Sequence, residues 1–320
     1  CDPLLMDSLL RILALLGCLW PLALVSAPMP VLVDSNWLSA NRDQVVVLDV
    51  RPRADFMAGH WPQARWAGFN ELDWQVDRYG LPGYLPAEPE LAALLGRLGL
   101  AGRESVVVIG SANQPRQIAE ASRVVWSLMM AGFQKVALLD GGIESLSTED
   151  LQQGLSTIET TRCEIALQPA LLADGNRVED LLGNNRPVID FRPRLYFEGY
   201  RRDPLVPEGG TIYDGVGIPP ERLLDAATGR FLSAEIIRQA FQRYDIQTTG
   251  TLATFSDTGV WAALGWFVLH QILENPNAQL YDGSLVEWID WGGEMYDSTD
   301  DMGGPIGFVL TGPNSTQMVR

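Results

Sequence analysis

The feature that most constrains the fold is a sequence pattern that occurs twice at a domain-sized spacing. Residues 47–53 (VLDVRPR) are matched 141 residues further on by residues 188–194 (VIDFRPR). Towards the end of each copy, the turn that begins at Asp140 returns at Asp282, a spacing of 142 residues. Two separate matches at nearly one spacing predict a duplicated domain rather than a short structural repeat.

Within each copy, short apolar runs alternate with segments of helical period. The expected strands are 45–48, 106–109 and 136–139 in the first copy and 188–189, 252–255 and 279–281 in the second, and the expected helices are 90–95, 118–130, 234–244 and 260–273. Continuous apolar strands separated by helices are typical of a parallel sheet that is covered on both faces. The sequence therefore predicts an α/β protein of two tandem domains, each a parallel sheet flanked by helices.

The 320 residues are enough for two domains of ordinary size, each with its own core. We expect the first domain at 28–151 and the second at 172–292. The polar segment 152–171 is the expected linker. Residues 293–320 contain Gly-Pro sequences and no helical or strand period, which predicts an irregular tail.

The first 27 residues have the pattern of a secretory signal peptide. Arg11 precedes an apolar run, and residues 25–27 (VSA) supply the small side chains that a signal peptidase requires, which predicts cleavage after Ala27 and a secreted or periplasmic protein. Two alternatives stay open. Residues 15–18 (LLGC) form a loose lipobox that would make Cys18 a lipid anchor. An uncleaved membrane anchor is the other, although the run is short for a span of about 20 residues.

Composition and charge exclude several classes of function. The formal net charge is −17 and the acidic side chains are spread along the chain, so nucleic acid is not an expected partner. The sequence contains only two histidines, His60 and His270, and no Cys-x-x-Cys pair, so no metal site is expected. Cys163 is the only thiol beyond the leader, and we expect it to be incidental because no helix follows it directly.

The stretch most able to hold a ligand is the strand, loop and helix of residues 252–273. An apolar strand ends at Phe255, a short polar loop follows, and a long apolar helical run begins near Val260. Backbone N–H groups gather at such a helix N-terminus, where the helix dipole favours an anion or a nucleophile of low pKa. Ligands of parallel α/β sheets lie beyond the carboxyl ends of the strands, which is where Ser256 is expected.

Residues 254–263 (TFSDTGVWAA) resemble the active loop of the rhodanese family of sulfurtransferases. Tandem members of that family carry a Cys-x-x-Gly-Val loop after an apolar strand and hold a persulfide on the cysteine; Ser256 stands at that position here. The repeated Asp-x-Arg strand ends and the Gly-His-x-Pro segment at 59–62 are further features of the family. In the first copy Gly110 takes the position of the nucleophile, which implies a non-catalytic first domain.

The resemblance also implies the residues of the site. Ser256 takes the catalytic position, Arg192 is expected to hold the loop or the substrate anion, and Arg201 and Arg202 are candidates for substrate binding. The rest of the loop would surround the anion: Asp257, Thr258, Gly259, Val260 and Trp261. The implied sulfur donor is thiosulfate or 3-mercaptopyruvate, a small anionic sulfur compound, and no cofactor is implied. The sequence identifies no protein partner.

Serine in place of cysteine changes the expected chemistry. Sulfur transfer needs a nucleophile that forms a persulfide, which a thiolate does and a hydroxyl does not. His270 lies about 20 Å from Ser256 along the same helix, at about 1.5 Å per residue, so it cannot serve as a base. The sequence therefore predicts a sulfurtransferase homologue that lacks the family's usual activity. The alternative is a non-catalytic anion-binding, protein-interaction or regulatory module on the same scaffold.

Overall fold

The computed structural model describes residues 28–155 and 157–297, and it contains two parallel sheets of five strands each. The first sheet (domain 1) has the order β1-β7-β6-β2-β3 and the second (domain 2) the order β11-β9-β12-β13-β8. The strands are β1 Leu32–Val33, β2 Val46–Asp49, β3 Arg65–Trp66, β6 Val106–Ile109 and β7 Val136–Leu139, followed by β8 Leu172–Ala173, β9 Val188–Asp190, β11 Val216–Gly217, β12 Leu252–Phe255 and β13 Ala278–Tyr281. Read from its other end, as β8-β13-β12-β9-β11, the second order matches the first strand for strand. This confirms two tandem parallel-sheet domains.

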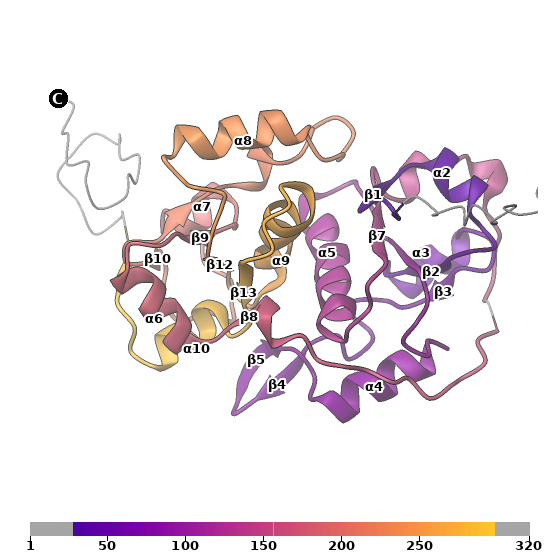
Figure 1. Cartoon of the computed structure of the whole chain (residues 1–320), viewed down its shortest axis with the longest axis horizontal. Coiled ribbons are helices and arrows are strands. Elements are labelled where there is room, and N and C mark those ends of the chain that lie inside the picture. The colour runs from indigo at the N-terminus through magenta and orange to yellow at the C-terminus, as the bar shows by residue number, and fades with distance from the viewer. Residues whose placement is uncertain (1–27, 156, 298–320) are drawn as a thin grey trace, which may run out of the picture.

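Helices cover both sheets, as the sequence predicted (Figure 1). They are α2 Ser35–Ala40, α3 Arg53–Ala58, α4 Glu88–Arg97 and α5 Pro115–Met130 in domain 1, and α6 Gly175–Gly183, α7 Arg194–Phe197, α8 Ala234–Arg243, α9 Val260–Trp266 and α10 Ser284–Asp290 in domain 2. Short 3-10 turns lie at Ile143–Ser145, Thr148–Asp150, Pro169–Leu171 and Pro220–Arg222. The expected helix 260–273 is α9 continued by a π-helical segment, η5 Phe267–Ile272.

The central strands are buried on both faces. β6 reads VVVI and β12 reads LATF, and all eight side chains lie in the interior. Such continuous burial is what helices on both sides of a parallel sheet require, because no strand face meets water. The apolar runs of the sequence therefore locate the middle of each sheet.

The segment after residue 292 is more ordered than expected. Gly292 adopts a positive φ of 77°, and the chain turns back so that β14 Met295–Tyr296 pairs antiparallel with β10 Thr211–Ile212. The carbonyl of Glu294 accepts hydrogen bonds from Tyr213 N–H at 3.0 Å and Trp288 Nε1–H at 3.1 Å. These bonds fix a strand where composition alone predicted irregular chain. The predicted leader, the lipobox Cys18 and the rest of the tail lie outside the described residues.

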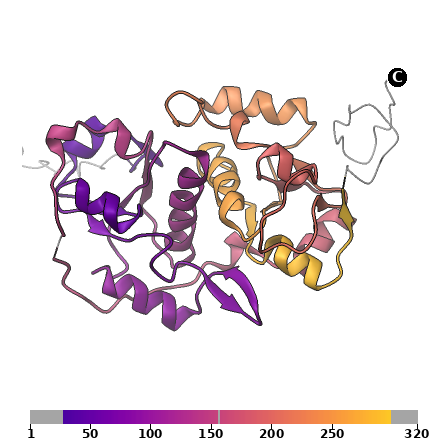
Figure 2. The ribbon, with the colours of Figure 1, turned by 180° about the vertical axis from the view of Figure 1, so that it is seen from behind.

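Helices α5 and α9 pack against each other at the centre of the molecule, one from each domain (Figures 1 and 2). Val124 and Leu128 of α5 belong to the same buried hydrophobic cluster as Leu264 and Phe267 on the domain 2 side. The two cores are therefore continuous across the interface. A large apolar interface of this kind opposes hinge motion between domains.

Each domain also sends an arm across the interface to the other sheet. The arm of domain 1 is the hairpin of β4 Val76–Arg78 and β5 Leu81–Tyr84, and Leu85 N–H beyond it donates to Asp282 at 2.7 Å. The arm of domain 2 is the turn of residues 224–231, which an antiparallel bridge between Leu224 and Phe231 closes, and Phe231 N–H donates to Asp140 at 3.0 Å. Asp140 and Asp282 are the repeated aspartates of the sequence. The duplication therefore extends to the contacts between domains, which are reciprocal as in a two-fold arrangement.

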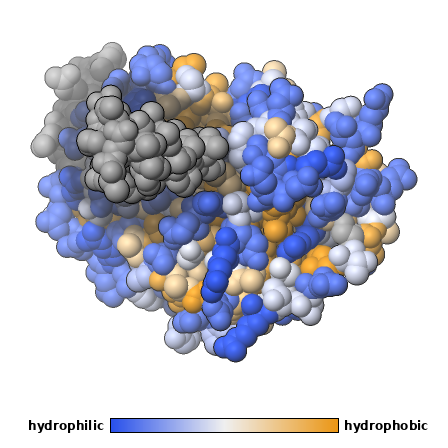
Figure 3. Space-filling view, turned by 45° about the vertical axis from the view of Figure 1, so that its right-hand side comes forward, coloured by the Kyte–Doolittle hydropathy of each residue, from blue (hydrophilic) through white to orange (hydrophobic). Residues whose placement is uncertain are grey.

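The face of the molecule shown in Figure 3 is mainly hydrophilic, with apolar residues in patches between polar ones. Among the helices of the described residues, none combines the length and the apolar character of a membrane span.

The hairpin of domain 1 offers a matched pair of glycines that tests this interface. Gly80 and Gly83 both have positive φ, 82° and 102°, but a Cβ on Gly83 would lie 2.9 Å from the carbonyl oxygen of Thr258, whereas a Cβ on Gly80 would meet nothing within 4 Å. We expect Gly80→Ala to cost about 1 kcal/mol through backbone strain. Gly83→Ala should cost about 1–3 kcal/mol more, because it also overpacks the interface. Chemical denaturation of both variants measures the difference, and equal losses of stability would contradict the contact.

Candidate active site

The loop between β12 and α9 lies at the carboxyl end of the domain 2 sheet, where the sequence placed it. Gly259 caps the helix in the left-handed conformation, with a φ of 80°. A Cβ at this position would collide with Arg123 Nη1 and would lie 3.2 Å from the carbonyl oxygen of Asp282. Only glycine fits both the backbone angle and the space, which explains the Gly-Val step of the loop.

Ser256 begins the loop and is fully buried. Its N–H donates to Ser284 Oγ at 3.2 Å, and its carbonyl accepts from Leu285 N–H at 3.0 Å. The turn at the start of α10 therefore holds the Ser256 backbone from both sides. The Oγ atom, by contrast, has no hydrogen-bond partner among the described residues. An unpartnered buried hydroxyl is costly and rare, and it indicates a place for a ligand or water.

The loop also contains open backbone donors. Within residues 28–155 and 157–297, no acceptor bonds the N–H groups of Asp257, Thr258 or Gly259. Buried backbone donors are nearly always paired in folded proteins. Three successive open N–H groups at a helix start, beside a free hydroxyl, suit an anion or several ordered waters.

Arg192 ties this loop to the neighbouring strand. Its guanidinium binds Asp190 through Nε–Oδ1 at 3.0 Å and Nη2–Oδ2 at 2.7 Å, and its Nη1 donates to Asp257 Oδ1 at 2.9 Å. Nη2 also donates to the carbonyl of Gly210 at 2.5 Å, and Thr211 Oγ1 donates to Asp190 at 2.8 Å. The whole group is buried. Arg192 therefore contacts the loop through Asp257, and two carboxylates already neutralise its charge.

Asp257 carries the strongest perturbation within the loop. Burial raises the pKa of its carboxyl to about 6, Arg192 opposes that shift, and the neighbouring carboxylates of Asp190 and Asp203 add to it. Oδ2 of Asp257 has no hydrogen-bond partner among the described residues. The pairing with Arg192 and the raised pKa both weaken the repulsion that this carboxylate would exert on a bound anion.

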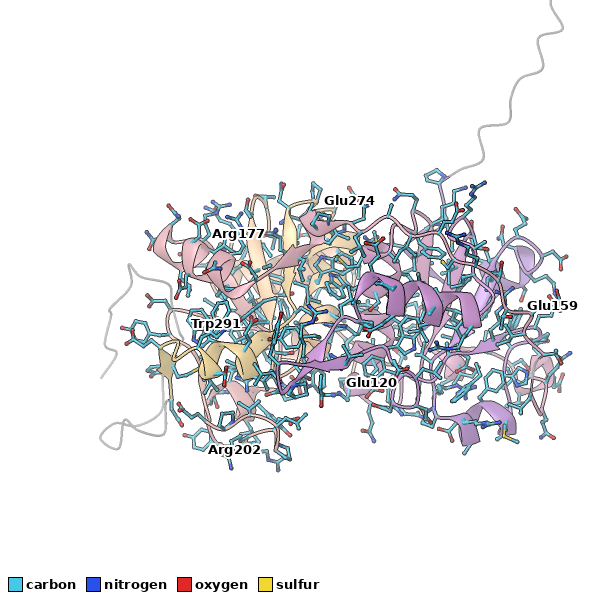
Figure 4. The ribbon with its side chains drawn as sticks, turned by 90° about the horizontal axis from the view of Figure 1, so that it is seen from below. Glu120, Glu159, Arg177, Arg202, Glu274 and Trp291 are labelled. Atoms are coloured by element: carbon cyan, nitrogen blue, oxygen red, sulfur yellow. The ribbon has the colours of Figure 1, made fainter. Side chains whose placement is uncertain are left out.

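The other candidate arginines are not part of this network. Arg201 and Arg202 are exposed, and Arg202 donates to the carbonyl of Pro207. Figure 4 shows Arg202 at the edge of the molecule. No hydrogen bond or ion pair of the described residues joins either side chain to residues 256–259. The nearby Asp203 does influence Asp257, so this segment borders the loop.

The corresponding loop of domain 1 is closed by its own chain. There the carboxylate of Glu144 accepts hydrogen bonds from Ser111 Oγ at 2.6 Å, Ala112 N–H at 2.8 Å and Asn113 Nδ2 at 2.8 Å. Gly110, at the position of Ser256, has no side chain to contribute. One of the two duplicated loops thus holds an internal carboxylate, while the other has open donors and a free hydroxyl.

The one thiol and the two histidines of the described residues lie outside the loop of residues 256–259. Burial raises the pKa of the Cys163 thiol to about 11, so it stays protonated at neutral pH. Burial lowers the pKa of His270 to about 4, and its ring stacks on Trp266. His60 stacks on Phe56 within domain 1. The described residues contain no cluster of three or more His, Cys, Asp or Glu side chains that could hold a metal ion.

Sequence reasoning missed three residues that shape the loop: Arg123, Ser284 and Glu144. Arg123 directly precedes the apolar run 124–126 in a segment whose other charge is Glu120, and this apolar neighbourhood was the available signal. Ser284 and Glu144 belong to the repeated Asp-Gly turns, which the sequence located but whose contacts with the loops it did not indicate.

Two tandem parallel-sheet domains, with a candidate loop at the carboxyl end of the second sheet, are the architecture of the rhodanese fold. The family model described as Rhodanese-like domain matches residues 34–149. The chain is similar to 3-mercaptopyruvate sulfurtransferase from Homo sapiens, with 29% identity over 86% of this chain and 91% of the relative. It is also similar to thiosulfate/3-mercaptopyruvate sulfurtransferase 1 from Arabidopsis thaliana, with 28% identity over 82% and 77%. The chain thus contains a rhodanese-like domain and is similar to sulfurtransferases over most of its length.

Solved structures agree on the fold. The anaerobic ergothioneine biosynthesis enzyme from Chlorobium limicola superposes with a TM-score of 0.73 at 17% identity, covering 83% of this chain and 70% of that one. YnjE superposes with a TM-score of 0.71 at 19% identity, covering 83% and 68%. At these identities the likeness concerns the fold alone.

The raised pKa of Asp257 predicts how stability depends on pH. The folded value of about 6 lies above the unfolded value of about 3.9, so between those pH values the native state binds more protons than the unfolded chain. This contribution to the free energy of unfolding is therefore present at low pH and falls, by about 2–3 kcal/mol in all, as pH rises through that window. Asp257→Asn removes the titrating group and should remove that fall.

The measurement is denaturant unfolding of the wild type and of Asp257→Asn between pH 4 and pH 7. Asp77→Asn is the matched control, because Asp77 is exposed. A wild-type stability that stays parallel to that of Asp257→Asn across the window would show that the Asp257 pKa is not raised.

Proposed function

We propose that this chain is a rhodanese-type sulfurtransferase homologue whose domain 2 loop binds a small anionic sulfur compound without carrying a persulfide. In this proposal Ser256 stands where active members of the family have cysteine, and the family's sulfur transfer does not occur there. The observation that carries the proposal is Ser256 itself: a buried hydroxyl without a partner, next to three open N–H groups.

The loss of activity follows from the chemistry of position 256. A serine hydroxyl is protonated at neutral pH and becomes a nucleophile only with a base within about 3 Å. His270 is taken up by its stack on Trp266, and burial keeps it neutral. Asp257 and Asp190 are bound to Arg192. Among the described residues, no hydrogen bond joins a basic group to the Ser256 hydroxyl. Oxygen, moreover, does not store the transferred sulfur as a persulfide.

Anion binding is supported by the second copy of the loop within the same chain. The domain 1 loop encloses the Glu144 carboxylate through two side chains and one backbone N–H. A loop of this geometry is therefore compatible with negative charge, even in an acidic protein. The similarity to sulfurtransferases that act on thiosulfate and 3-mercaptopyruvate points to donors of that class as the anions to test first.

We expect the wild-type protein to form no thiocyanate from thiosulfate and cyanide, because position 256 has no thiol. Ser256→Cys places a thiol at the start of α9, where its pKa should fall below about 8.5. This variant should gain turnover and, in mass spectrometry, the mass of one added sulfur atom after exposure to thiosulfate. Turnover that appears in Ser256→Cys and is absent from the wild type would show that the rest of the site is intact.

Cys163→Ser serves as the control in both backgrounds, since Cys163 is the other thiol within the described residues. Wild-type turnover that survives Cys163→Ser would refute the loss of activity. For binding, thiosulfate should raise the melting temperature of the wild type in a concentration-dependent way. No shift at millimolar thiosulfate or 3-mercaptopyruvate would refute the anion-binding role.

A further inference from the structure

We infer that Arg123, a residue of domain 1, positions the anion-binding loop of domain 2; this inference rests on the proposed function of that loop. Arg123 lies on α5 and is fully buried at the domain interface. It forms an ion pair with Asp282 of domain 2, and its Nη2 donates to the carbonyl of Gly83 at 3.2 Å. Its guanidinium carbon lies 4.4 Å from the ring centroid of Trp126.

Arg123 acts on both ends of the loop. At the far end its Nη1 lies against Gly259, so close that a Cβ there would collide with it. At the near end it binds Asp282, the first residue of the turn that continues to Ser284. Ser284 Oγ accepts the hydrogen bond from Ser256 N–H and donates to the carbonyl of Tyr281 at 2.8 Å. A continuous set of contacts therefore runs from the guanidinium to the Ser256 backbone.

Stability alone does not explain this side chain. Burying an ion pair usually gains little over apolar packing, because both charges lose their hydration. Here Nε and Nη1 of Arg123 have no hydrogen-bond acceptor among the described residues, which adds to that cost. A fully buried charge with two unpaired donors, in contact with a candidate ligand loop, indicates a functional role.

The duplication provides an internal comparison. In domain 1 the aspartate equivalent to Asp282 is Asp140, and it receives the matching N–H bond from the opposite arm. The cation near Asp140 is Arg230, which comes from that arm and not from the partner helix. The side chains of α9 and of η5 as far as Leu269 are apolar or glycine. Within the described residues, a buried arginine on the helix of the opposite domain therefore lies against the loop with open donors, and α9 offers no equivalent to the loop closed by Glu144.

The test compares Arg123→Met, which keeps the apolar stem, with Arg123→Lys, which keeps the charge. Arg103→Met is the matched control, because Arg103 forms an exposed pair with Glu164. Two readouts are taken on folded protein: the dissociation constant for thiosulfate by calorimetry, and amide hydrogen exchange of residues 256–260. Residues 110–114 of domain 1 are the internal reference for exchange.

For Arg123→Met we expect thiosulfate binding to weaken about tenfold and exchange at 256–260 to rise by a similar factor, equivalent to about 1.4 kcal/mol. Exchange at 110–114 should not change, Arg123→Lys should recover part of both effects, and Arg103→Met should show neither. A lower melting temperature with unchanged affinity and unchanged exchange at 256–260 would show a purely structural role and overturn the inference.

The role of Arg123 can still be tested if Arg123→Met does not fold or if the wild type does not bind thiosulfate. If Arg123→Met does not fold, the double variant Arg123→Gln/Asp282→Asn replaces the ion pair by a neutral pair of similar shape, with the same outcomes expected. If the wild type itself does not bind thiosulfate, the proposed function fails, but the exchange of 256–260 still decides the role of Arg123. An increase confined to that loop supports it, and no increase refutes it.

Discussion

The candidate site depends on how the buried loop 256–259 is fixed by the segments around it. Residues 256–259 connect a fully buried strand to a helix, and the first two residues of the loop are fixed by hydrogen bonds to other segments. The α10 turn holds the backbone of Ser256, and the Asp190–Arg192 pair holds Asp257. Because the fixing bonds use the carbonyl of Ser256 and the carboxylate of Asp257, three loop N–H groups remain available. In the proposed function, the binding site is formed by the donors that these contacts leave unpaired.

The duplication places residues of both domains around the candidate loop of domain 2. The arms that cross the interface are related by the repeat, and so are the aspartates that receive them. The equivalence ends at the loops. Glu144 closes the loop of domain 1, whereas the loop of domain 2 lies against the hairpin of domain 1, with Gln75 Nε2 donating to the carbonyl of Thr258 at 2.6 Å. Domain 1 has become a support for domain 2, and its own site is filled from within.

The sequence predicted much of this because its strongest signals are local. Apolar runs located the strands, the repeated Asp-x-Arg pattern located the duplication, and the pattern around Ser256 predicted the strand, loop and helix of the candidate site. What it could not predict depends on contacts between distant segments. The bond from Ser256 to Ser284, the pairing of β14 with β10 and the approach of Arg123 to Gly259 all join residues that only the folded interface brings together. Arg201 and Arg202 show the reverse, since family resemblance suggested them and the described contacts leave them outside the loop's network.

The most direct test of the central claim is a crystal structure of the wild-type protein soaked with thiosulfate, with the sulfur atoms located by anomalous scattering. The account predicts one anion in the domain 2 loop, with its oxygens accepting hydrogen bonds from the N–H groups of residues 257–259 and with no covalent bond to Ser256. A vacant loop at saturating thiosulfate, or sulfur bonded to the Ser256 side chain, would contradict it.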